Sequence, residues 1–254
     1  MGGLGIKGLL IAVQFLTVIS FAPRLFVQEA ELTAALSYFP FVGLIIGFLL
    51  AGVYWALGGW CQAPVLGVIE TMTLAFLTRG LHLDGLADTF DAIGSGRPAE
   101  AALLIMKDSQ IGALGAVSLI LVLLLKSCAL AEISRVGFWQ VMVLAPCLSR
   151  WGLNVLAAGS DYARPAGGLG QAFVGRKTWW TLPVSGSSAL VAAWFLAGAW
   201  GLWAFLGVVF WGLLMDFYYG KRFGGVTGDI LGAHLELTET FLLLAGAVSV
   251  NRAA

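Results

Sequence analysis

The sequence predicts an all-α fold, a polytopic integral membrane helical bundle of about six to eight helices. Hydrophobic residues make up 59% of the 254 positions and charged residues only 11%, whereas soluble domains carry about 25% charged residues. Mean hydropathy is +0.91. No segment alternates apolar and polar residues as a membrane strand must. The whole chain, residues 1–254, is expected to form a single membrane-embedded domain.

Apolar runs long enough to cross a bilayer follow one another along the chain. The N-terminal run resembles a signal peptide but lacks a small-residue cleavage site, so it is expected to be retained as a short or re-entrant helix. GAWG, residues 198–201, is either a turn between two spans or a kink within one. The predicted spans are 8–22, 36–57, 64–79, 112–131, 136–153, 183–198, 201–219 and 237–250.

Three polar segments, 79–111, 154–182 and 220–236, fall on one side of the membrane when the spans are counted. Lys and Arg concentrate in them, so by the positive-inside rule this side is expected to face the cytoplasm from the cytoplasmic (inner) membrane. The basic residues placed on this side are Arg24, Arg79, Arg97, Lys107, Arg150, Arg164, Arg176, Lys177, Lys221 and Arg222, and those placed opposite are Lys7, Lys126, Arg135 and Arg252. Formal net charge is zero, which gives no basic field for nucleic acid.

The stretch HLDGLADTFD, residues 82–91, places three acids directly after a predicted span. If that span continues as a helix past Arg79, then Asp84, Asp88 and Asp91 stand at i, i+4 and i+7 and share one face. Like charges at this spacing repel one another, so a compensating cation is required. Mg²⁺ bound to these oxygens and to a phosphate is the predicted solution. Ion pairing with Arg79 and Lys107 is the structural alternative.

Further candidates lie in or beside the three polar segments. Arg97 and Lys107 can reach phosphate oxygens, and Asp108 can ligate a metal or orient a lysine. Thr227-Gly228-Asp229 can cap a helix or bind a ligand. His82 lacks the spacing of a metal ligand and is a candidate hydrogen-bonding contact to substrate. The remaining candidates are Arg150, expected at a span end, Arg164 in a glycine-rich stretch, and Arg222. Together these residues predict metal-assisted chemistry on a phosphorylated substrate.

Four stretches, HLDGLADTFD, IMKDSQIGALG, YARPAGGLGQAF and KRFGGVTGDILGAHLELTE, resemble in order and spacing the cobalamin synthase family (adenosylcobinamide-GDP ribazoletransferase). The resemblance implies a magnesium-dependent enzyme that joins adenosylcobinamide-GDP to α-ribazole or its 5′-phosphate and releases GMP. The family's acidic motif falls on Asp84, Asp88 and Asp91, the metal ligands. Its basic positions fall on Lys107, Arg150, Arg164 and Arg222.

This reading assigns catalysis to Asp84, Asp88, Asp91, Lys107 and Asp108, and substrate binding to His82, Arg97, Arg150, Arg164, Arg222 and Asp229. Asp91 is the candidate general base because it lies farthest from the span. The expected partners are the two substrates, the lipid bilayer, and a second copy of the chain or other enzymes of the corrinoid pathway. Two alternatives are a membrane prenyltransferase, which normally needs a second acidic motif, and a divalent-cation transporter, which favours acids deep within facing spans.

Overall fold

The computed structural model describes residues 5–20, 27–164 and 167–251, and these residues form helices without a strand. One isolated bridge joins Tyr162 to Val226. The elements in chain order are α1 (Ile6–Leu16), α2 (Glu29–Ala35), η1 (Leu36–Tyr38), α3 (Phe39–Leu57), α4 (Ala63–Leu77), α5 (Leu81–Gly94), α6 (Ala99–Ile105), α7 (Ala113–Val136), α8 (Trp139–Gly159), η2 (Leu169–Phe173), η3 (Arg176–Thr181), α9 (Leu182–Phe223) and α10 (Gly228–Asn251).

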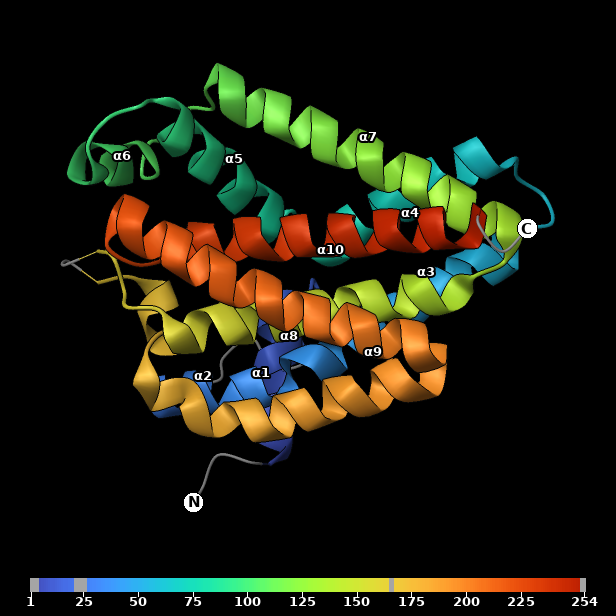
Figure 1. Cartoon of the computed structure of the whole chain (residues 1–254), viewed down its shortest axis with the longest axis horizontal. Coiled ribbons are helices and arrows are strands. Elements are labelled where there is room, and N and C mark those ends of the chain that lie inside the picture. Colours follow the sequence, from blue (N-terminus) through green and yellow to red (C-terminus); the bar gives the residue numbers. More distant parts are fainter. Residues whose placement is uncertain (1–4, 21–26, 165–166, 252–254) are drawn as a thin grey trace.

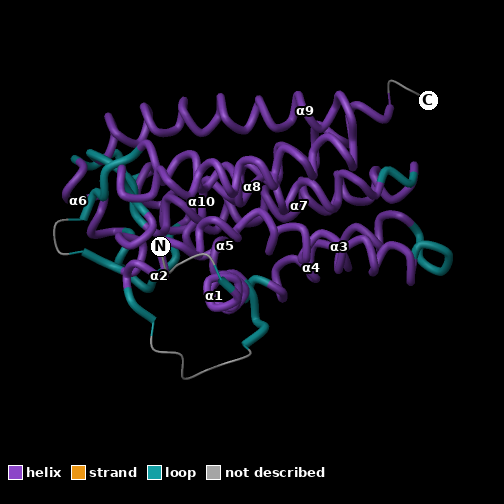
Figure 2. Tube along the Cα trace, turned by 90° about the horizontal axis from the view of Figure 1, so that it is seen from below, coloured by secondary structure: helices purple, strands orange, loops and turns teal. Residues whose placement is uncertain are grey.

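The long helices run side by side along the longest axis of the molecule, with α8 near the centre (Figures 1 and 2). Nearly all side chains of α8 are buried, because α3, α9 and α10 pack around it. The contact with α3 is close: a Cβ at Gly43 would lie 2.4 Å from the Pro146 carbonyl oxygen, and one at Gly47 would lie 2.5 Å from the Val143 Cα. Small residues spaced four apart allow such helix contact in membranes.

Five described segments are long and apolar enough to cross a membrane, and a sixth arises if the bent pair α4–α5 counts as one span. The prediction of an all-α, polytopic membrane protein is therefore confirmed. The five are Glu29–Leu57, Ala113–Val136, Trp139–Gly159, Arg176–Phe223 and Gly228–Ser249.

The first and the last predicted spans are among those that differ from the observed helices. The run at 8–22 forms α1, which has only 11 residues and is too short for a 30 Å core at about 1.5 Å per residue. Figure 2 shows α1 end-on while the long helices run across the view. Residues 21–22 lie outside the described part of the chain. The last span begins at Gly228 rather than at 237, so the third polar segment is largely helical.

The backbone of α9 leaves helical geometry at Gly198, with φ 53° and ψ −128°. A positive φ is readily adopted only by glycine. The chain reverses there, and the two halves of α9 lie antiparallel (Figure 1). Residues 183–198 and 201–219 are therefore separate passes along the bundle, so GAWG is a turn.

The three polar segments meet at one end of the bundle, on the left of Figure 1. Backbone hydrogen bonds from Ala163 N to Val226 O (2.9 Å) and from Val226 N to Asp161 O (2.8 Å) join the second segment to the third. Arg222 Nη2 donates to the Arg97 carbonyl (3.0 Å) and joins the third segment to the first. We call this the polar end.

Several basic residues lie elsewhere than predicted. Lys126, expected on the side opposite the polar segments, is buried within the helix α7. Lys7 pairs with Glu31 of α2 (2.6 Å), and α2 lies towards the polar end (Figure 1). Arg24 and Arg252 are outside the described residues. Arg135 lies in the last turn of α7, at the opposite end as predicted.

Candidate active site

The site begins at a break between α4 and α5. Arg79 and Gly80 both adopt positive φ (56° and 65°), and the two helices meet at 92°. The predicted continuous helix past Arg79 is therefore wrong. Arg79 donates to the Gln14 carbonyl (3.3 Å) in α1. The acids nevertheless share one helix, α5, so their common face is retained.

Asp229 joins these acids from the first turn of α10. A Cβ at Gly85 would lie only 2.7 Å from the Asp229 carbonyl oxygen, so glycine at this position allows α5 and α10 to touch. Asp88 interacts electrostatically with Asp84, Asp91 and Asp229. We call Asp84, Asp88, Asp91 and Asp229 the acidic cluster. Thr227 caps α10, because its Oγ1 accepts the Ile230 N–H (3.2 Å).

One cation faces the acidic cluster directly. Arg164 Nη2 lies 2.6 Å from Asp229 Oδ2, and within the described residues no Lys or Arg pairs with Asp84, Asp88 or Asp91. The alternative of an acidic face neutralised by Arg79 and Lys107 is therefore not what the structure shows. Burial raises the pKa of the neighbouring Tyr162 phenol, so this hydroxyl remains a hydrogen-bond donor. Four carboxylates meet one guanidinium, which leaves a surplus of negative charge.

Asp91 differs from its neighbours because it binds the start of α7. Its Oδ2 accepts the Gly112 N–H and its Oδ1 the Gly115 N–H, both at 2.7 Å. The N-terminus of a helix favours a negative charge and leaves N–H groups without partners within the helix. Asp91 therefore fixes α7 against α5.

No three His, Cys, Asp or Glu side chains in the described part of the chain converge on one metal position. A protein cage of Asp84, Asp88 and Asp91 is thus not preformed. Mg²⁺, however, usually keeps several waters and binds one or two carboxylates together with substrate phosphate. Asp84 and Asp88, one helical turn apart and facing Asp229, fit that mode of binding.

The predicted basic residues around the site are only partly gathered. Lys107 and Asp108 are exposed and follow α6. Their turn lies beside α10, because Thr227 Oγ1 contacts Met106 Sδ (3.8 Å). Asp108 Oδ1 accepts the Gln110 N–H (3.1 Å). Arg97 is exposed, and Arg222 bonds to its carbonyl. These residues line the same end as the acidic cluster.

Arg150 lies elsewhere. It is fully buried within α8 and pairs with Glu239, so its predicted place at a span end is wrong. Lys126 Nζ lies 2.5 Å from Glu236 Oε2 and 2.6 Å from Glu239 Oε1. We call Lys126, Arg150, Glu236 and Glu239 the buried ion network. The sequence signal for it was Glu236 and Glu239 at i, i+3 within an apolar run, which places both acids on one helix face.

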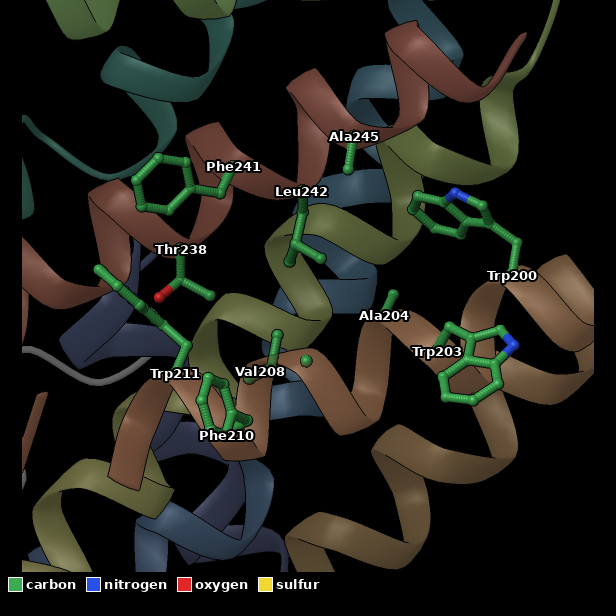
Figure 3. Close-up of a pocket in the computed structure, with 11 residues that line it drawn as sticks. Trp200, Trp203, Ala204, Val208, Phe210, Trp211, Thr238, Phe241, Leu242 and Ala245 are labelled. Carbon is green, nitrogen blue, oxygen red and sulfur yellow. The ribbon is translucent and has the colours of Figure 1, made fainter. Parts of the chain in front are cut away.

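An apolar groove of about 470 Å³ lies between the second half of α9 and α10 (Figure 3). Its lining is aromatic and aliphatic, with Thr238 as the polar exception. Trp203, Phe210 and Phe241 in this groove are exposed, as expected for a surface that faces lipid. Because it carries no ionisable group, the groove cannot supply the acid–base or metal chemistry of the acidic cluster.

Comparison with protein families matches residues 8–247 to the family described as cobalamin-5-phosphate synthase. The chain belongs to this family. A relative from Desulforamulus reducens is 38% identical, with 94% of this chain and 97% of that protein covered. One from Syntrophobacter fumaroxidans is 39% identical, with 93% and 96% covered. Both are named adenosylcobinamide-GDP ribazoletransferase.

Membership of the family confirms the resemblance drawn from the four sequence stretches. A relative from Geotalea daltonii carries the same name at 35% identity, with 92% of this chain and 94% of that protein covered. The comparisons do not support a prenyltransferase or a cation transporter. No solved structure matches the chain.

Proposed function

We propose that the protein is an adenosylcobinamide-GDP ribazoletransferase that works at the polar end of the bundle. The acceptor is α-ribazole or its 5′-phosphate, and the products are the completed corrinoid and GMP. The observation that carries the site assignment is the surplus negative charge of the acidic cluster, at the end where all three polar segments meet. The family assignment and the relatives' names support the reaction.

The reaction exchanges one phosphorus–oxygen bond for another. A ribose hydroxyl of the acceptor attacks the phosphorus attached to cobinamide, the bond to the guanosine-bearing phosphate breaks, and GMP leaves. The hydroxyl proton passes to a carboxylate of the acidic cluster. Asp84 or Asp88 serves this role better than the predicted Asp91, whose two oxygens already accept N–H groups of α7.

Asp84 and Asp88, facing Asp229, would hold Mg²⁺ against the substrate diphosphate. The ion would neutralise phosphate charge in the transition state. Arg164 Nη2 lies 2.6 Å from Asp229, so its guanidinium is placed to donate a hydrogen bond to a phosphate oxygen of the bound diphosphate. Lys107, Arg97 and Arg222 add positive charge around the same end, which favours binding of an anionic substrate.

The direct test is product formation by purified protein in liposomes. With adenosylcobinamide-GDP, α-ribazole 5′-phosphate and Mg²⁺, we expect GMP release in step with corrinoid coupling, and EDTA should stop both. Release of GDP would contradict attack at the cobinamide-side phosphorus. Turnover that survives EDTA would contradict the magnesium site.

The polar end faces the cytoplasm in this proposal, as the distribution of Lys and Arg favours. Single cysteines at Ser109, Gln171 and Gly220, in a variant without native cysteines, should resist an impermeant thiol reagent in intact cells. All three positions are exposed. A cysteine at exposed Gly59, in the loop at the opposite end, is the matched control and should be labelled. Labelling of Ser109→Cys from outside would reverse the orientation.

A further inference from the structure

A second cavity, of about 180 Å³, opens beside the acidic cluster and reaches into the bundle. Asp84, which is exposed, and Asp229 form part of its wall. Buried Phe39 of α3, Leu153 of α8 and Leu231 of α10 also line it, so the cavity connects the acids to an apolar interior. The lining residues used below are Phe15, Phe39, Phe173, His82, Asp84 and Asp229.

Three phenylalanine rings from separate elements gather in this lining. The Phe15 and Phe173 ring centroids lie 4.8 Å apart, and those of Phe39 and Phe173 lie 5.7 Å apart. Both pairs are tilted, with interplanar angles of 48° and 49°. Phe173 is held in place because Thr33 Oγ1 donates to the carbonyl of its neighbour Ala172 (2.6 Å). Such a group of rings favours a flat, aromatic occupant.

His82 adds a polar requirement to this apolar wall. The residue is only 4% exposed, it lines the cavity, and its Nδ1 has no hydrogen-bond partner among the described residues. Buried polar atoms are normally hydrogen-bonded. An occupant with one polar ring atom would supply the missing partner.

The size and polarity of the cavity indicate which part of the two substrates fits inside it. Drug-sized ligands take roughly 300–1,000 Å³, so about 180 Å³ excludes a corrin ring. Guanine carries several donors and acceptors, and those that face the three phenylalanines would be left without a partner. The base of ribazole is a flat, methyl-substituted benzimidazole with one free ring nitrogen, which matches the rings and His82.

We propose that this cavity binds the benzimidazole base of the ribazole acceptor. Phe15, Phe39 and Phe173 enclose the ring, and His82 Nδ1 hydrogen-bonds to its free nitrogen. The attached ribose then lies at the Asp84 and Asp229 side, where its hydroxyl meets the diphosphate. This inference rests on the proposed function and adds the place and orientation of the acceptor.

The first test uses binding without turnover. Calorimetric titration of the protein with free 5,6-dimethylbenzimidazole should show binding that Phe173→Leu and His82→Phe each weaken about tenfold. Phe241→Leu, the matched substitution in the groove between α9 and α10, should leave binding unchanged. Equal affinity in all four proteins would overturn the proposal. Binding by a protein that does not turn over adenosylcobinamide-GDP would keep the cavity and reject the proposed function.

The second test uses kinetics of the unmodified protein, so it does not depend on variants that fold. Free dimethylbenzimidazole should inhibit competitively against α-ribazole 5′-phosphate and not against adenosylcobinamide-GDP. Acceptors whose base is imidazole or a naphthalene-fused imidazole should both show a higher KM than the benzimidazole acceptor. Inhibition competitive with the donor, or a KM that does not change with the size of the acceptor's base, would overturn the acceptor site. Either result would leave the transferase reaction intact.

Discussion

The acidic cluster and the buried ion network hold charge in opposite ways. In the network, Lys126 and Arg150 neutralise Glu236 and Glu239 by direct ion pairs inside the bundle. At the polar end, Arg164 is the partner of Asp229, and Asp84 and Asp88 form no ion pair with a described Lys or Arg. The network is nearly closed to solvent, whereas Asp84 is exposed.

This difference separates structural from functional charge. Buried charges in a membrane protein are tolerated when they are paired, and each ionised group of the network has a partner of opposite charge. Carboxylates that repel one another at an open end destabilise the protein slightly and gain a partner only when a cation arrives. Charge balance, rather than the presence of acids, therefore identifies the site.

The largest expected effect is on turnover. Asp84→Asn and Asp88→Asn should each lower kcat by about 10²–10³-fold, the scale of losing one electrostatic contact to a reacting phosphate. Thermal unfolding in detergent should stay the same or rise, because each change removes repulsion. Asp161→Asn, at an exposed aspartate of the same end, should change neither. Near-normal turnover in both Asp84→Asn and Asp88→Asn would show that the acidic cluster is not the functional site.

The network should respond in stability. Glu239→Gln leaves Arg150 without its carboxylate and removes one partner of Lys126, so unfolding free energy should fall by about 3 kcal/mol. Glu132→Gln, which breaks an ion pair with the exposed Arg135, should cost less than about 1 kcal/mol. Chemical unfolding in detergent measures both. If Glu239→Gln kept its stability and lost turnover, the network would belong to the active site.

Asp91 lies between the two cases. Asp91→Asn retains one acceptor for the N–H groups at the start of α7, so stability should fall by about 1 kcal/mol and turnover by less than about tenfold. Parallel measurement of unfolding and GMP release decides the point. A loss of turnover as large as that of Asp84→Asn would make Asp91 a metal ligand or the general base.

The smallest effect is expected at the periphery. Lys107→Met removes one of several exposed cations, so KM for adenosylcobinamide-GDP should rise about two- to fivefold, the factor given by up to 1 kcal/mol. Lys177→Met, at an exposed lysine that pairs with Glu29 (2.5 Å), serves as the matched control. A change in kcat alone would place Lys107 at the reacting phosphate instead.

The fold class and the meeting of the polar segments could be predicted, because apolar run length and helical periodicity are local properties of the sequence. The shared face of Asp84, Asp88 and Asp91 followed from the same periodicity. The bend at Arg79 and Gly80 did not, since a positive φ at arginine has no sequence signal beyond the neighbouring glycine.

Contacts between distant helices were the other limit. Lys126 and Glu236 are 110 positions apart, and Arg150 near a predicted span end gave no indication that Glu239 would reach it. The phenylalanines of the second cavity lie in apolar runs, where an aromatic residue is more often part of a core than of a site. Only the packing of α1, α3 and η2 brings the three rings together.

The position of Glu239 on the last helix has a consequence for biosynthesis. Lys126 and Arg150 leave the ribosome well before Glu236 and Glu239 do, and a lone Lys or Arg at the centre of a membrane helix costs about 2.5–3.5 kcal/mol on insertion scales. Until α10 is synthesised, the cations of α7 and α8 therefore lack these carboxylates, and the insertion machinery or water must solvate them. A chain that stops before α10 leaves Lys126 and Arg150 without the carboxylates that neutralise them in the completed protein.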